Sequence, residues 1–408
     1  MPSSVEKAAA RRRFAAGLGY ALTLLSAFWI IVASCATPER GARLFDQGRR
    51  TDALPLLEAA AARGSVPSSY RLGLLLEAGE AAPRDLPRAL ALFTYAAGKN
   101  HLPSQIRAGD LSRSVSGDDA VAAGWYDRAA RQGDPAAMTR LGIMRLSGAG
   151  GPADVDAALS LLRRAAATGS AQAATALGQA LLSLGDAGDP RGGTPEEAAA
   201  FFKTAETLGN PEAMNRLADL YASGRGVPRD PAQAAALRRK AADAGYAPAA
   251  YDLGLMYLSG QGVSAYPLEA GRLFERAAAA GHVPAMLKLA DMLYAGEGVF
   301  RDPSRALALY DAAGKADDTA AGHLCQLFAA GPEERRDAGR ATLFCGKAAA
   351  AGDTNAATLL GLGMVHGRIP GDPAIAATLL SRAAWAGNAE AMYAMALLHL
   401  AGQGVAGN

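Results

Sequence analysis

Apolar residues in the stretch 247–259 recur at the spacing of an amphipathic helix. They fall at positions i, i+3, i+4 and i+7, namely Ala250, Leu253, Gly254 and Tyr257. This spacing places them on one face of a 3.6-residue turn and predicts a helix. A Gly-x-Gly-Val segment follows at Gly260 and Gly262. It predicts the end of the helix, because glycine adopts positive φ at little cost.

A second helical stretch follows each of these turns. Asp230-Pro231 and Asp302-Pro303 predict where it starts, since aspartate is a good N-cap and proline suits the first helical turn. Alanine pairs near its end let two helices approach closely, while larger side chains fill the wider gaps. Three aromatic residues at helical spacing are expected in the core: Tyr257, Phe274 and Tyr310.

The two-helix pattern repeats with a period of 36 residues. Three consecutive blocks carry it, each with leucine at its seventh position: 211–246, 247–282 and 283–318. A fixed period of this size indicates an array of supersecondary units. One helical hairpin cannot bury its own apolar face, but stacked neighbours can. The sequence therefore predicts an all-α fold, a right-handed α-solenoid of about nine to ten helix-turn-helix repeats of ~36 residues.

The solenoid is expected to occupy residues 44–408. Two units, 102–134 and 319–353, lose the Gly-x-Gly turn, and a third carries an insertion at 185–195. We interpret this insertion as a surface loop, with a partner-binding loop as the alternative. The array ends on a first helix, so either a partner covers its apolar strip or the strip is small enough to remain exposed. That strip comprises Met392, Met395 and Leu398.

Residues 1–35 have the pattern of a signal peptide. A basic start precedes the stretch 14–34, which has no charged residue. The segment Val-Ala-Ser-Cys35 resembles a bacterial lipobox, which implies that Cys35 becomes the acylated N-terminus of a lipoprotein at the outer membrane. A linker over 36–43 would follow. The alternative is a retained transmembrane anchor, since 21 uncharged residues can span a bilayer.

Composition and charge favour a helical repeat protein and disfavour a protein that binds nucleic acid. Half of the residues are hydrophobic but only 6% are aromatic, which fits an alanine-packed helical array better than a large enclosed core. Once residues 1–35 are set aside, basic and acidic residues nearly balance. The sequence shows no basic stripe of the kind that binds nucleic acid.

Cys325 and Cys345 lie in the same predicted unit. Cys325 takes the core leucine position of the first helix, and Cys345 takes the position of Phe274 in the second helix. Antiparallel helices bring these positions face to face. In an oxidising periplasm this arrangement favours a disulfide. The alternative is a pair of buried free thiols that pack as small hydrophobic residues.

The sequence contains no motif typical of catalysis or metal binding. The five histidines lie mostly at block junctions or on helix faces, without a His-Glu-x-x-His or Cys-x-x-Cys motif. His101 and His282 are expected in solvated turns between units. The Gly-x-Gly turns lack the strand context and the Lys-Ser/Thr of a phosphate-binding loop. We expect a non-enzymatic protein without cofactor or metal; residues of the concave face cannot be singled out.

The motif Ala-x-x-x-Leu-Gly-x-x-Tyr-x-x-Gly-x-Gly-Val and its second half are nearly complete in residues 247–282. This motif resembles the Sel1-like repeat, a relative of the tetratricopeptide repeat. The layout of the chain over 1–408 is similar to that of the alginate-secretion lipoprotein family. That family combines a lipobox signal with about nine and a half such repeats.

This resemblance implies a lipid-anchored scaffold on the periplasmic side of the outer membrane. It would help to assemble an exopolysaccharide (alginate-like) secretion complex, with two kinds of partner. One is an outer-membrane β-barrel exporter, and the other comprises periplasmic polysaccharide-modifying or polymerase-complex proteins. Helical repeats suit this role because they present extended surfaces.

Two other classes of function are weighed against the scaffold. One is a Sel1-repeat regulatory or envelope-stress adaptor, held at the inner membrane by an uncleaved helix. The other is an enzyme of the kind ascribed to cysteine-rich relatives, which carry a cysteine pair in nearly every repeat. This chain has one candidate pair, so the enzyme is disfavoured.

Overall fold

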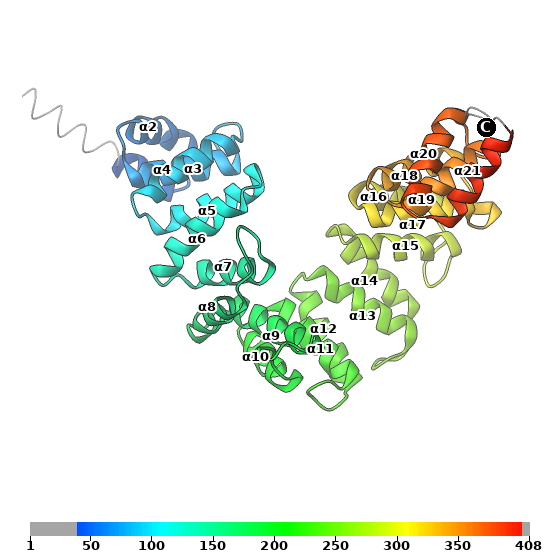
Figure 1. Ribbon diagram of the computed structural model, residues 1–408. Coiled ribbons are helices and arrows are strands. Elements are labelled where there is room, and N and C mark those ends of the chain that lie inside the picture. Colours follow the sequence, from blue (N-terminus) through cyan, green and yellow to red (C-terminus); the bar gives the residue numbers. More distant parts are fainter. Residues whose placement is uncertain (1–38, 402–408) are drawn as a thin grey trace, which may run out of the picture. The chain divides into compact units, whose positions relative to one another are not determined.

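The computed structural model describes residues 39–401. All regular elements in this range are helices, and they form successive helix-turn-helix pairs (Figure 1), so the predicted α-solenoid is confirmed. The chain divides into two compact units, one ending at Thr194 and the other beginning at Pro195. The division falls at the end of the insertion 185–195 that interrupts the sequence pattern.

The first unit begins with a helical segment at 39–46. The linker predicted over 36–43 is therefore helical from residue 39 onward, and the helices start before the predicted boundary at Leu44. The helices that follow are α2 (Arg50–Ala62), α3 (Val66–Ala78), α4 (Leu86–Gly98), α5 (Leu102–Ser116), α6 (Asp119–Arg131), α7 (Pro135–Ser147), α8 (Val155–Ala167) and α9 (Ala171–Asp186).

The second unit continues the same alternation and contains one short 3-10 helix, η1. Its helices are α10 (Pro195–Thr207), α11 (Pro211–Ser223), α12 (Pro231–Asp243), α13 (Ala247–Ser259), α14 (Pro267–Ala279), α15 (Val283–Ala295), α16 (Pro303–Ala316), α17 (Asp318–Ala330), η1 (Glu333–Arg335), α18 (Ala338–Ala350), α19 (Thr354–Val365), α20 (Pro373–Trp385) and α21 (Ala389–Ala401).

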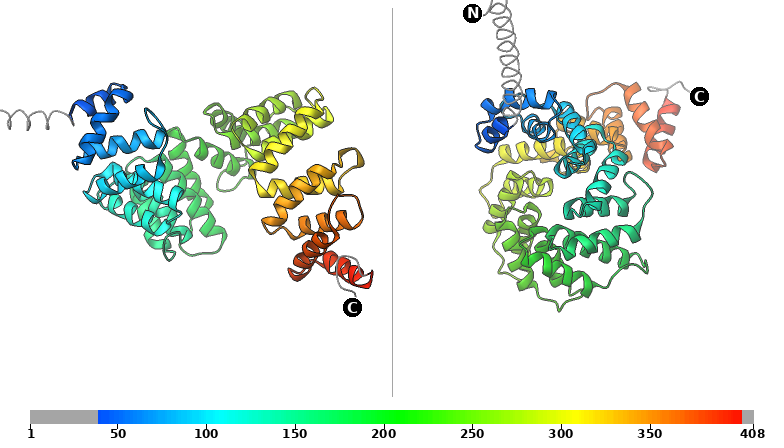
Figure 2. Two further views of the ribbon diagram at one scale, coloured as in Figure 1. Left: turned by 90° about the horizontal axis from the view of Figure 1, so that it is seen from above. Right: turned by 90° about the vertical axis from the view of Figure 1, so that its left-hand side faces the viewer.

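Odd-numbered helices from α3 onward are the first helices of their repeats, and even-numbered helices from α4 onward are the second helices. Within each unit, a first helix packs antiparallel on its own second helix and also on the preceding second helix (Figure 2). Successive first helices also touch, as α7 and α9 do in the first unit and α17 and α19 do in the second. The first helices therefore line the inner side of the curve in each stack.

The closest contact inside a repeat joins the eighth residue of the first helix to the eighth residue of the second. Gly254 lies against the ring of Phe274, so that a Cβ built on Gly254 would come within 2.6 Å of Phe274 Cε1. Phe274 is fully buried. The same small-against-large pair recurs in four other repeats: Gly73–Phe93, Gly109–Tyr126, Gly142–Leu162 and Gly361–Leu380.

The predicted turn and cap chemistry is confirmed where it was most specific. Gly260 and Gly262 have φ of +72° and +71°, which only glycine adopts cheaply. The side chain of Asp230 accepts a hydrogen bond from Gln233 N at 2.9 Å and so caps α12. Tyr310 is buried as predicted, but Tyr257 is half-buried and its hydroxyl bonds to Arg239.

The exposed strip on the last described helix differs from the predicted one. Leu398 is buried, and Met395 packs against the same terminal core, so among the three predicted residues Met392 alone is exposed. The outer side of α21 instead carries Tyr393 and Leu400, which are 68% and 81% exposed. The reason is that α21 turns the face with Leu398 onto α20.

The eighth-position contact predicts opposite effects for two glycine substitutions. Gly254→Ala should destabilise the protein by about 1–3 kcal/mol, because the added methyl group overlaps the Phe274 ring in a filled core. Gly124→Ala is the matched control, since Gly124 lies inside α6 with nothing within 4 Å of the added carbon. It should stabilise by about 0.5–1 kcal/mol. Urea denaturation of each variant tests the pair, and equal effects would contradict this packing.

Candidate functional site

Cys325 and Cys345 meet at the eighth-position contact of α17 and α18. The structure joins their Sγ atoms at 2.09 Å, with the Cα atoms 4.6 Å apart. Both side chains are fully buried. Because α17 begins at Asp318, Cys325 occupies the position of Gly254 and not the leucine position assigned from the sequence. The disulfide therefore replaces the small-against-large pair of other repeats.

A hollow of about 530 Å³ lies on the inner side of the second unit and is lined in part by α17, the helix that carries Cys325. We call it the α15 groove, because α15 forms its centre between the ends of α13 and α17. Its lining comprises Tyr251, Val283, Pro284, Leu287, Lys288, Asp291, Asp317, Thr319, Ala320 and His323.

The aromatic wall of the α15 groove is held in place by stacking. The ring centroid of Tyr251 lies 5.1 Å from that of His282 and 5.6 Å from that of Phe274. His282 Nδ1 accepts a hydrogen bond from Ala285 N at 3.3 Å, so His282 also caps α15. Burial lowers the pKa of His282. His282 is therefore a half-buried structural residue, in contrast to the solvated position expected from the sequence.

The acidic side chains of the groove already have partners. Asp291 Oδ1 accepts a hydrogen bond from the Tyr310 hydroxyl at 2.6 Å and forms an ion pair with Arg335 at 3.3 Å. Burial, then this hydrogen bond, raise the pKa of Tyr310. Asp317 caps α17 through Ala320 N at 2.7 Å. These carboxylates are therefore less able to attract a cationic ligand.

The basic side chains of the groove are uncommitted. Among the residues that the structure describes, neither the Lys288 amine nor the His323 imidazole has a hydrogen-bond or ion-pair partner. Both occupy the sixth position of their helices, so the repeat places them on the same side of the stack. The groove thus combines an apolar wall of Tyr251 and Leu287 with donors that suit a carboxylate.

The hollow continues toward α19. A second hollow of about 320 Å³ shares Thr319 and His323 with the α15 groove and is further lined by Gln326. Gly322 keeps this part open, since a Cβ there would lie 2.8 Å from Asp353 Oδ2. The inner side of three successive first helices thus offers one extended surface, which suits a length of polypeptide better than a small molecule.

A buried polar cluster lies beside this surface, between α11, α12 and α13. Arg238 occupies the eighth position, where Phe274 stands in the next repeat, and its Nη2 donates to Asp219 at 2.6 Å. Burial raises the pKa of Asp219 in spite of Arg238. Asn215 Nδ2 donates to Asp252 at 3.0 Å. Within the described residues, the buried atoms Asn215 Oδ1 and Arg238 Nε have no hydrogen-bond partner. The side chains of this cluster line neither hollow described above.

Sequence reasoning missed the lining of the groove. The signal that would have found it is the register of the blocks, counted from each N-cap. The fifth and sixth positions are Tyr251 and Asp252 in α13, Leu287 and Lys288 in α15, and Gly322 and His323 in α17. These positions vary while the core positions repeat. Variation against a fixed framework is the pattern expected of a binding surface.

Several predicted features fall elsewhere or outside the described range. Cys35 and the signal peptide predicted over residues 1–35 lie outside the described residues. Within 39–401, no helix is long and apolar enough to cross a bilayer. In the same range, no three His, Cys, Asp or Glu side chains are grouped to hold a metal ion. His101 lies half-buried against Tyr70, with ring centroids 5.0 Å apart, as His282 lies against Tyr251.

Comparison with known families gives a match over most of the array. A family model described as Sel1 repeat matches eight segments, which together exceed half of the chain. The unmatched stretches include the insertion-bearing unit and the disulfide-bearing unit. The matched segments are 66–101, 104–134, 135–170, 211–246, 247–282, 283–318, 354–388 and 389–408.

Solved structures and a curated protein resemble the chain more distantly. A protective antigen of uropathogenic Escherichia coli strains, which displays an SLR fold, has a TM-score of 0.50 and 27% identity, over 87% of this chain and 76% of that chain. A Sel1 repeat protein from Oxalobacter formigenes has a TM-score of 0.45 and 21% identity, over 68% of this chain and 96% of that chain.

An uncharacterised protein of Neisseria meningitidis serogroup B is 29% identical over 178 residues. The match covers 43% of this chain and 35% of the relative, so the chain spans about a third of the length of this curated relative.

The disulfide should stabilise the unit that carries α17. Replacing both Cys325 and Cys345 by alanine opens a loop with a sequence separation of 20, which should lower the free energy of unfolding by about 3 kcal/mol. Urea denaturation measures this loss. Wild-type protein, denatured without reductant, should resist alkylation at both cysteines. Alkylation at both would show that the thiols are free.

Proposed function

The chain belongs to the Sel1 repeat family, whose members mediate protein–protein interaction, and we propose that it is a non-enzymatic scaffold that holds a partner protein in the α15 groove. The observation that carries this proposal is the pairing of an apolar wall with uncommitted basic groups. Tyr251 and Leu287 suit an apolar side chain, and Lys288 and His323 suit a neighbouring carboxylate. The occupant is therefore an extended segment of a protein that carries both.

The N-terminal sequence supports a proposal for the location of the scaffold. We propose that residues 1–35 direct export, that Cys35 is acylated, and that the repeats face the periplasm at the outer membrane. The disulfide between Cys325 and Cys345 supports an oxidising compartment. A lipid anchor with more than one acyl chain is sufficient for stable membrane attachment.

The proposed process is assembly of an exopolysaccharide (alginate-like) secretion complex. The support is the likeness of the chain's layout to that of lipoproteins with this role, a lipobox followed by a long repeat array. The partners would be a β-barrel exporter and periplasmic polysaccharide-modifying or polymerase-complex proteins. A fixed array of docking surfaces would hold such proteins close together and raise their local concentration.

Reversal of the Lys288 charge should release the partner of the groove. A photoreactive amino acid at Leu287 in the full chain should cross-link in living cells to a defined site on an envelope protein, next to Asp or Glu. Lys288→Glu should reduce this cross-link about tenfold, because attraction becomes repulsion. Mass spectrometry identifies and quantifies the cross-linked peptides.

Lys315→Glu is the matched control for Lys288→Glu. Lys315 carries the same charge in the same unit, but it is exposed on α16 and does not line the groove. Its reversal should leave the cross-link unchanged. Equal losses in both variants, or cross-links in wild-type cells to sites without acidic residues, would refute docking by the groove.

Loss of Cys35 should detach the scaffold from the membrane. Cys35→Ala should abolish incorporation of an alkyne-labelled fatty acid, and the protein should move from the membrane to the soluble envelope fraction. Fractionation and in-gel fluorescence measure these two changes. Unchanged membrane retention without label would favour the uncleaved inner-membrane anchor and the adaptor function.

A further inference from the structure

The turns between first and second helices pack onto the preceding repeat. In four repeats, the second glycine of the turn lies against the first residue of the preceding second helix. The contacts join the loop of one repeat to the start of a helix in the repeat before it. They are Gly150 on Asp119 of α6, Gly226 on Pro195 of α10, Gly262 on Pro231 of α12, and Gly298 on Pro267 of α14.

This contact requires an occupant without a side chain at its closest point. A Cβ on Gly262 would lie 2.1 Å from the carbonyl oxygen of Pro231. Glycine avoids this overlap because it has no Cβ. The same glycine has φ of +71°. The next residue adds apolar contact: the equivalent Val299 reaches Gly271 on the face of α14. A Gly-x-Gly-Val turn therefore presents bare backbone and one valine to the preceding helix.

The start of α4 has no such covering turn. The next repeat should provide it, but α5 runs to Ser116 and only Gly117 and Asp118 connect it to α6. Regular repeats have seven residues here, as between Ser223 and Pro231. The space that a regular turn occupies is instead a cavity of about 640 Å³, which we call the α4 cavity.

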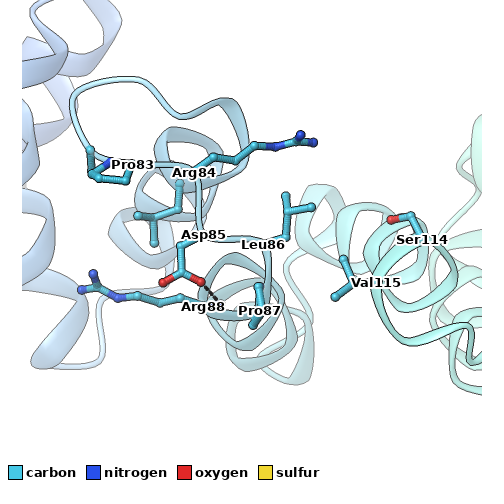
Figure 3. Close-up of a pocket in the computed structure, with 10 residues that line it drawn as sticks. Pro83, Arg84, Asp85, Leu86, Pro87, Arg88, Ser114 and Val115 are labelled. Atoms are coloured by element: carbon cyan, nitrogen blue, oxygen red, sulfur yellow. Dashed lines mark hydrogen bonds between the residues drawn. The ribbon is translucent and has the colours of Figure 1, made fainter.

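Apolar side chains face the α4 cavity from both of its sides (Figure 3). Leu86 and Pro87 at the start of α4 form one side, and Ser114 and Val115 at the end of α5 form the other. Val115 is 36% exposed. The cavity thus leaves apolar surface open to solvent.

The charged residues at the rim are committed to the chain itself. Asp85 accepts from Arg88 N at 3.0 Å and caps α4. Arg84 Nε donates to the carbonyl oxygen of Glu77 at 3.1 Å, and Arg88 binds Glu58 at 2.9 Å. Each guanidinium thus has one donor bound within the chain. We take shape and apolar contact with Leu86, Pro87 and Val115 as the features that select what the cavity accepts.

We propose that the α4 cavity is a docking site for a Gly-x-Gly-Val turn presented by a partner protein. The four repeats show what fills the equivalent place, a turn with a left-handed glycine. In three of them valine follows this glycine, at Val227, Val263 and Val299, and in the fourth Gly151 follows Gly150. The site takes the missing turn in trans. It is separate from the α15 groove and independent of the function proposed for it.

A peptide with the sequence of residues 293–303, which contains the turn at Gly296 to Val299, is a direct probe. Labelled peptide should bind the full chain saturably in fluorescence anisotropy. The peptide with Gly298→Ala should not bind, because the added carbon would meet the α4 backbone as it meets Pro267 in the chain. Absence of binding by the unmodified peptide overturns the proposal.

Filling the cavity in the protein gives the second test. Val115→Trp should weaken peptide binding about tenfold or more, since the indole would fill part of the cavity that Val115 lines. Val121→Trp is the matched control, because Val121 is 46% exposed on α6 and does not line the cavity. It should bind as wild type does. The proposal is refuted if Val115→Trp binds the peptide as strongly as Val121→Trp does. It is also refuted if the wild-type protein binds the Gly298→Ala peptide as strongly as the unmodified peptide.

Discussion

The fold depends on how closely two antiparallel helices approach at the eighth residue of each. Where that residue is glycine, a buried ring or leucine of the partner helix fills the space, as Phe274 does above Gly254. In α17 and α18 a covalent bond replaces the packing. Alanine-rich surfaces on either side let the contact repeat without large side chains. This single contact sets the shape of each hairpin, and stacking the hairpins gives the array.

Few positions of each repeat form the core. The residues on the inner side of the first helices, at their fifth and sixth positions, can therefore differ from repeat to repeat. The α15 groove uses that freedom. Two residues around the groove have structural contacts: His282 caps α15, and Asp291 forms an ion pair with Arg335. In the part of the chain that the structure describes, Lys288 and His323 have no such contacts and are free to bind a partner. The disulfide adds rigidity to the helix that carries His323. Tyr251 is held by stacking on Phe274 and His282, and a side chain that is already held in place loses less entropy when a partner binds.

The sequence predicted the features that depend on local backbone chemistry, namely the turns, the helix caps and the repeat period. Glycine turns such as Gly260 and caps such as Asp230 follow from local chemistry, and their period revealed the array. Positions that depend on register do not follow from local chemistry. Cys325 was assigned to the leucine position because the N-cap Asp317 shifts its unit by one residue, and the α21 strip was misplaced because helix rotation depends on packing. Arg238 in an aromatic position and the groove itself were not foreseen, since surface positions obey no local rule.

The contacts of the turns run one way along the array, from each repeat to the repeat before it. Each regular turn lies on the repeat before it, so a repeat lends cover toward the N-terminus and receives it from the C-terminal side. Helix packing joins a repeat to both neighbours, but the cover of the turn goes only to the repeat before it. When the C-terminal end of the array unfolds, each lost repeat should therefore take from the repeat before it both packed helices and the cover of a helix start.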